Sequence, residues 1–159
     1  MTTSINETRI IADPDVPLVR IIREFDAPPE KVFRAHTDPD LFVQWNGPHG
    51  YELRLDQFDC RTGGSFRYVM VGDGFEGGFR GCFHEVREGE LIIQTFTFEG
   101  LPDGVALERI MFEDLGNERT LLTSTSLVDS FEGRDEFLAS GMEVGVRDGF
   151  ERLDALLGR

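Results

Sequence analysis

Apolar and polar positions alternate with a period of two along the middle of the chain. From Tyr51 to about Leu127, runs such as residues 66–70 and 79–83 place an aromatic residue, Met or Gly at every second position. Glycine- and asparagine-containing turns separate these runs, so the spacing predicts six strands with short connections. Strands joined in this way, without intervening helices, indicate an antiparallel meander.

The first part of the chain predicts one more strand and two short helices. Residues 18–25 are rich in Val and Ile and predict the first strand of the sheet. Prolines then open two helical segments, one ending near His36 and one running from Asp38-Pro39 to Trp45. Residues 1–17 form a polar N-terminal segment, in which only residues 8–12 could form a short strand.

The end of the chain changes to a helical period. Between about Arg134 and Leu157, apolar residues recur at spacings of three, four and seven, which predicts one long amphipathic helix. Its apolar stripe consists of Leu138, Met142, Val146, Phe150, Leu153 and Leu157. The predicted fold is therefore α+β: one domain, residues 18–159, in which a curved antiparallel sheet of six to seven strands grips the C-terminal helix.

This geometry predicts either a filled trough or a cavity between sheet and helix. A sheet of about seven strands curls, and a helix about 10 Å wide cannot fill the resulting trough alone. Gly141, Gly145 and Gly149 recur along the helix, which indicates either close packing of its backbone or space kept for a ligand. Trp45 and Phe42 are expected either in the core or as a gate. The candidate ligand-binding residues are Phe42, Trp45, Tyr68, Phe83, Phe96, Phe98, Phe112, Met142, Val146 and Phe150.

Composition narrows the classes of partner. Fourteen Phe stand against two Tyr and one Trp, which favours an apolar interior. The formal net charge is -14 and no basic run is present, so nucleic acid and anionic membrane surfaces are unsuitable partners. We expect no membrane span and no secretory signal. Cys60 and Cys82 fit no metal or redox spacing, which predicts reduced, buried thiols in a cytoplasmic protein.

Candidate chemistry in the sequence is sparse. His36 is expected at a helix C-terminus, where the helix dipole favours its charged form, His49 in a loop without a partner, and His84 facing outward. We predict no catalytic residue, no metal site and no cofactor. Glu108 and Arg109 are neighbours on one strand, so one of them must point inward. That side chain is either a hydrated group at the cavity mouth or a polar anchor for a ligand carboxylate or hydroxyl.

Several motifs resemble a known family. The order of elements, with residues 23–28 (REFDAP), 37–39 (TDP) and 45–48 (WNGP), resembles the START-like helix-grip superfamily (SRPBCC), which includes polyketide cyclases/dehydratases and lipid-transport proteins. Within it the chain is most similar to the branch named after the activator of the heat-shock protein 90 ATPase. The motifs GGSF at 63–66, GCFHEV at 81–86 and GMEVG at 141–145 add to the match, which spans residues 18–157. Departures occur at Asn46, where relatives have an aromatic residue, and at Val146, where they often have Trp.

The resemblance implies a protein that binds a small hydrophobic or amphipathic molecule between the sheet and the C-terminal helix. Two alternatives stay open. One is an enzyme similar to polyketide cyclases, with Tyr68, Arg109 or an inward carboxylate as acid or base, although we favour a protein without enzymatic activity. The other is a chaperone cofactor, as the branch name suggests. A homodimer also stays open.

Overall fold

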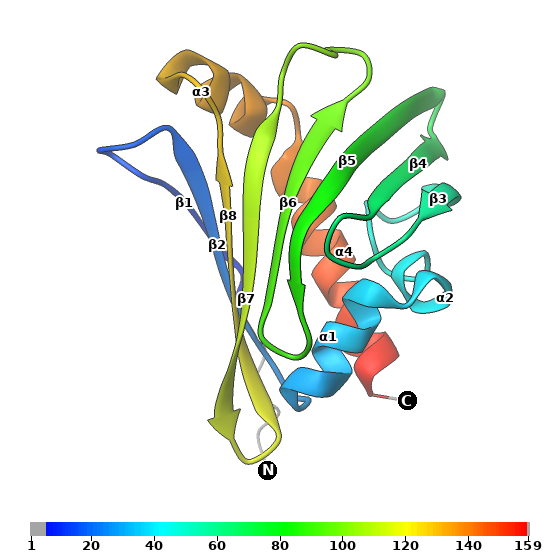
Figure 1. Ribbon diagram of the computed structural model, residues 1–159, viewed down its shortest axis with the longest axis vertical. Helices are drawn as coiled ribbons and strands as arrows, with labels where there is room; N and C mark the ends of the chain where they lie inside the picture. The colour runs from blue at the N-terminus through cyan, green and yellow to red at the C-terminus, as the bar shows by residue number, and fades with distance from the viewer. Residues whose placement is uncertain (1–5, 159) are drawn as a thin grey trace.

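An antiparallel sheet of eight strands forms the framework of residues 6–158, the part of the chain described by this computed structural model (Figure 1). Each strand pairs only with antiparallel neighbours. The predicted fold class, a curved antiparallel sheet with helices in an α+β arrangement, is confirmed. In the order of the sheet, the strands are β1 (Arg9–Ala12), β2 (Leu18–Phe25), β8 (Arg119–Leu127), β7 (Ala106–Gly116), β6 (Leu91–Phe98), β5 (Phe75–Arg87), β4 (Ser65–Gly72) and β3 (Glu52–Phe58).

Strand β1 accounts for the one strand beyond the predicted six to seven. It lies within the segment 8–12 and pairs with β2 in the register Arg9↔Ile22. Ile10 packs partly buried against the core. A strand of four residues with one core contact gives a weak sequence signal, which explains why the sequence alone left it open.

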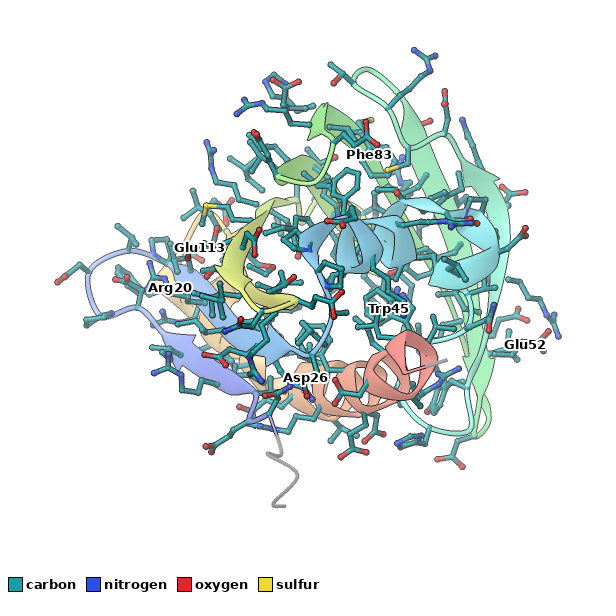
Figure 2. The ribbon with its side chains drawn as sticks, turned by 90° about the horizontal axis from the view of Figure 1, so that it is seen from below. Arg20, Asp26, Trp45, Glu52, Phe83 and Glu113 are labelled. Atoms are coloured by element: carbon teal, nitrogen blue, oxygen red, sulfur yellow. The ribbon has the colours of Figure 1, made fainter. Side chains whose placement is uncertain are left out.

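The two proline-started helices are present and lie beside one end of the sheet (Figure 1). Helix α1 (Pro29–Thr37) has proline in its first turn and buries Val32 and Phe33. Helix α2 (Pro39–Phe42) is a single turn capped by Asp38, whose side chain accepts a hydrogen bond from the backbone N–H of Asp40. The segment after α2 carries Trp45 into the interior, between α1 and the last helix (Figure 2).

The prediction of one continuous C-terminal helix is wrong. The chain instead forms α3 (Phe131–Ala139) and α4 (Met142–Leu157), with α3 at the end of the sheet opposite α1 (Figure 1). Gly141 separates the two helices with φ of +89°, a left-handed conformation that glycine adopts without steric cost. The apolar stripe continues across this break, so the periodicity concealed it. None of the helices within residues 6–158 is long and apolar enough to cross a membrane.

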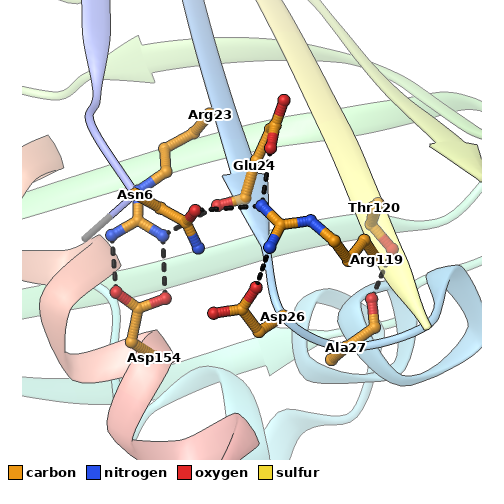
Figure 3. Close-up of polar contacts among 8 residues, drawn as sticks. All are labelled: Asn6, Arg23, Glu24, Asp26, Ala27, Arg119, Thr120 and Asp154. Carbon is orange, nitrogen blue, oxygen red and sulfur yellow. Dashed lines mark hydrogen bonds and ion pairs between the residues drawn. The ribbon is translucent and has the colours of Figure 1, made fainter. Parts of the chain in front are cut away.

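A nearly buried arginine ties α4 to the sheet. Arg23 on β2 is 3% exposed, and its two terminal nitrogens donate to the carboxylate of Asp154 on α4 at 2.7 and 2.5 Å (Figure 3). The guanidinium also lies 4.7 Å from the ring centre of Phe25. Nearby, Arg119 donates to Glu24 and Asp26 (Figure 3). The Arg23–Asp154 pair holds α4 against the sheet, whereas the contacts of Arg119 join β8 to the end of β2.

Candidate ligand-binding cavity

A cavity of about 780 Å³ lies between the sheet and helices α3 and α4. This volume falls within the range of about 300–1,000 Å³ that is usual for small-molecule sites. Phe75 after the β4–β5 turn and Val144 in α4 both line it and are 39% and 58% exposed, so the mouth lies between them. A smaller hollow of about 400 Å³ beside β1 has lining side chains, such as Arg119 and Glu24, that are already paired with each other. The larger cavity is therefore the candidate site.

Eight of the ten side chains predicted from the sequence line this cavity: Phe42, Trp45, Tyr68, Phe83, Phe96, Met142, Val146 and Phe150. The other two lie outside it. Phe98 packs at the end of β6 against Phe79, with ring centres 5.2 Å apart. Phe112 shares the inward face of β7, but α1 covers that end of the sheet, and the ring packs 5.3 Å from Phe33. The alternation of apolar residues along β7 correctly predicted that Phe112 lies on the inward face of the sheet. It could not show which helix covers that part of the face.

Trp45 belongs to the core and to the cavity wall at once. It is 5% exposed, and its indole N–H donates to the carbonyl oxygen of Ala35 at 2.8 Å. Its ring stacks 6.2 Å from Phe150. Because the indole is held at both its polar and its apolar side, Trp45 is a fixed part of the wall.

The glycines of the last helix have different roles. A Cβ on Gly149 would lie 3.2 Å from the carbonyl oxygen of Trp45 and 3.4 Å from the amide of Gly47, so α4 approaches this segment closely. A Cβ on Gly145 would meet only Pro48, at an ordinary 3.7 Å, and Gly145 lines the cavity. Close packing therefore explains Gly149, Gly145 has room for a Cβ at an ordinary contact distance, and Gly141 forms the break between helices.

A row of polar side chains crosses the mostly apolar floor. Gln94 on β6, Glu108 on β7 and Ser126 on β8 are direct neighbours in the sheet register. The Gln94 amide donates to one oxygen of Glu108 at 3.0 Å, and the Ser126 hydroxyl donates to the other at 2.5 Å. Burial raises the pKa of Glu108, although both hydrogen bonds act in the opposite direction. Glu108 is thus the inward member of its pair with Arg109, which is exposed.

Tyr68 faces the same interior from β4. Burial raises the pKa of its hydroxyl, the charge of Glu108 adds to this effect, and a hydrogen bond with Asn46 lowers it. The hydroxyl therefore stays protonated at neutral pH and can donate a hydrogen bond. Asn46 also lines the cavity and contributes a polar side chain to this wall.

His36 does not have the predicted role of a charged group at a helix end. Its ring is 7% exposed, with Nδ1 2.8 Å from the carbonyl oxygen of Val32, and it packs 4.8 Å from Trp45. Burial lowers its pKa to about 4, so the imidazole is neutral at physiological pH. The desolvation cost of the charged ring outweighs the favourable helix dipole.

This buried histidine predicts a loss of stability in mild acid. The unfolded chain protonates His36 near pH 6.5, whereas the folded chain resists protonation down to about pH 4, so acid favours unfolding. Between about pH 8 and about pH 5, this group is expected to remove about 2 kcal/mol of unfolding free energy. Urea titrations across that range measure the loss. His36→Gln should flatten this dependence, and the matched change at exposed His84 should not; an unchanged slope in His36→Gln contradicts the assignment.

The loop histidine has partners that the sequence did not reveal. The Nε2 atom of His49 lies 3.2 Å from a carboxylate oxygen of Glu151, and the His49 backbone N–H donates to Asp148. One ligand atom from each of the three residues lies within 4.8 Å of the others, a spacing compatible with a divalent cation. All three side chains are at least partly exposed, and two of them, His49 and Asp148, line the cavity. Their mutual contacts connect α4 with the loop after α2.

The two cysteines are unpaired, but the prediction that both are buried is wrong. Cys82 is exposed, because its strand position faces outward. Cys60 is partly buried, and burial raises the pKa of its thiol to about 11. His84, two residues after Cys82 on β5, faces outward as predicted.

A sheet that wraps a C-terminal helix and encloses a mostly apolar cavity defines the START-like helix-grip class of proteins. Within this class, the chain belongs to the family described as "Activator of Hsp90 ATPase homolog 1-like protein", which matches residues 26–158. The resemblance inferred from the sequence motifs is thereby confirmed.

Solved structures support the same fold. Protein Ms6760 from Mycobacterium smegmatis superposes with a TM-score of 0.86 at 24% identity, over 94% of this chain and 96% of that one. A protein from Arthrobacter aurescens superposes with a TM-score of 0.85 at 27% identity, over 94% of this chain and 91% of that one. CV1439 from Chromobacterium violaceum superposes with a TM-score of 0.75 at 27% identity, over 90% of this chain and 98% of that one. A search of curated proteins finds no match.

Proposed function

We propose that this protein binds a small hydrophobic or amphipathic molecule in the cavity between the sheet and α4. The volume of about 780 Å³, enclosed mainly by aromatic and aliphatic side chains, is the observation that carries the proposal. Transfer of apolar surface from water into such a site gains roughly 25 cal/mol per Å². A molecule of modest size therefore gains enough free energy to bind even after it loses its freedom of motion.

The arrangement of the wall supports a site that exists before the ligand arrives. Trp45 is held by its hydrogen bond to Ala35, and Phe42 packs 5.1 Å from Phe58. Tyr68 and Phe79 stack at 5.4 Å. Rings fixed by one another do not need to be ordered on binding, which reduces the entropic cost. The cyclase-like and chaperone-cofactor alternatives, a homodimer and the cytoplasmic location stay predictions from the sequence.

A neutral fluorescent probe tests the proposal directly. N-phenyl-naphthylamine fluoresces weakly in water and strongly in apolar surroundings, so titration of the folded protein should give a saturable increase with about one probe per chain. Decanol should displace the probe. A signal that rises without saturation, or that decanol does not reduce, would contradict a defined internal site.

A further inference from the structure

The charges along the cavity wall have one sign. Among the described residues that line it, none is Lys or Arg, whereas Glu108 lies in the interior and Asp73 and Asp148 lie at the mouth. Of the two histidines in the lining, His36 is neutral and His49 is next to acidic partners. The whole chain adds a formal net charge of -14. Both the cavity and the field around it therefore favour positive over negative molecules.

Glu108 has no positive partner among the described residues. Its contacts, Gln94 and Ser126, are neutral groups that donate one hydrogen bond each. A carboxylate in an apolar interior is costly unless a cation compensates it. Because the side chain also faces the cavity space, a bound molecule can provide the missing charge.

Aromatic faces surround the same region. Phe83 is the neighbour of Gln94 on β5, and Phe96 follows two residues along β6, with its ring 5.5 Å from Phe79. Tyr68 is close enough for the charge of Glu108 to perturb its hydroxyl. Such rings attract a cation through their negative faces and at the same time bind the hydrocarbon attached to it.

We propose that the cavity selects basic amphiphiles: apolar molecules with a protonated amine, whose ammonium group lies against the Glu108 carboxylate while the hydrocarbon lies along the aromatic wall. This inference rests on the proposed ligand-binding function and specifies its ligand class. A fatty acid or another carboxylate would bring a like charge to Glu108 and is disfavoured. The polar row thus acts as an anchor for a cationic group rather than for a carboxylate.

Three probes with the same hydrocarbon chain test this specificity. Decylamine, decanol and decanoic acid are each used at neutral pH to displace N-phenyl-naphthylamine from the full chain. A charged hydrogen bond is worth more than a neutral one, so decylamine is expected to bind about tenfold more tightly than decanol. Decanoic acid is expected to bind most weakly of the three.

The variant Glu108→Gln separates charge from shape. Its amide oxygen can still accept from Gln94, and its N–H₂ group can donate to the Ser126 hydroxyl, which is able to accept as well as donate. The fold should therefore persist, which circular dichroism verifies. We expect decylamine to lose its advantage over decanol in this variant. Glu113→Gln, on the outward and exposed face of the same strand, removes the same charge and should leave the advantage intact.

Each outcome of these titrations decides a different question. The inference is overturned if decanoic acid binds as tightly as decylamine, or if Glu108→Gln retains the amine preference. Equal binding of all three probes contradicts the amine selectivity but leaves a general apolar site in place. If none of the probes displaces the dye, the proposed function itself fails, and the inference fails with it.

Discussion

Filling the cavity from both walls is expected to weaken binding of N-phenyl-naphthylamine by at least about tenfold while the chain still folds. Val146 projects from α4 and Ser124 from β8, and both line the cavity. The double variant Val146→Trp/Ser124→Phe places two large rings into open space, so the cost of overpacking should be small. Because less volume remains for the probe, its dissociation constant should rise at least about tenfold. Fluorescence titration of the variant measures the loss.

The matched control is Thr123→Phe, which adds the same ring one residue away on the outward face of β8. This variant should bind the probe as the parent does. If the double variant is folded and binds the probe with unchanged affinity, the probe occupies another place, and the cavity is not the binding site.

Asp154→Ala is expected to cause the largest loss of stability, about 2–4 kcal/mol in the free energy of unfolding. In this variant the buried guanidinium of Arg23 keeps only one acceptor among the described residues, the carbonyl oxygen of Glu24. The Nε atom of Arg23 already has no partner among the described residues. The expected loss stays below that of a fully buried pair, because the Asp154 side chain is 40% exposed. Urea unfolding measures it.

Arg23→Met provides the contrast. Methionine removes the charge but keeps much of the apolar stem that packs on Phe25, so it should cost clearly less than Asp154→Ala. A loss below about 1 kcal/mol in Asp154→Ala would show that water already compensates Arg23. The ion pair would then not be what fixes α4 across the sheet.

Local pattern was sufficient for most of the fold. The period of two located β3 to β8, because each of these strands is buried on one face. It failed at Gly141, where the apolar stripe passes from α3 to α4 without interruption although the backbone turns. That break depends on a backbone conformation, and the spacing of apolar side chains contains no information about it.

The candidate site was predictable for most of its apolar part. Inward-facing rings such as Phe83 and Phe96 follow from alternation along a single strand. The polar row does not, because Gln94, Glu108 and Ser126 belong to three strands and become neighbours only through the sheet register. One usable signal was present: Glu108 has the same parity along β7 as buried Ala106 and therefore had to face inward.

A crystal structure of the chain grown with bromonaphthalene would show whether an apolar molecule enters the cavity, because the anomalous signal of bromine locates the molecule without interpretation of its shape. We expect a bromine peak between Phe96 on β6 and Val146 on α4, in a cavity whose walls keep their present positions. A cavity closed by its own side chains, with bromine bound only on the outer surface, would contradict this expectation.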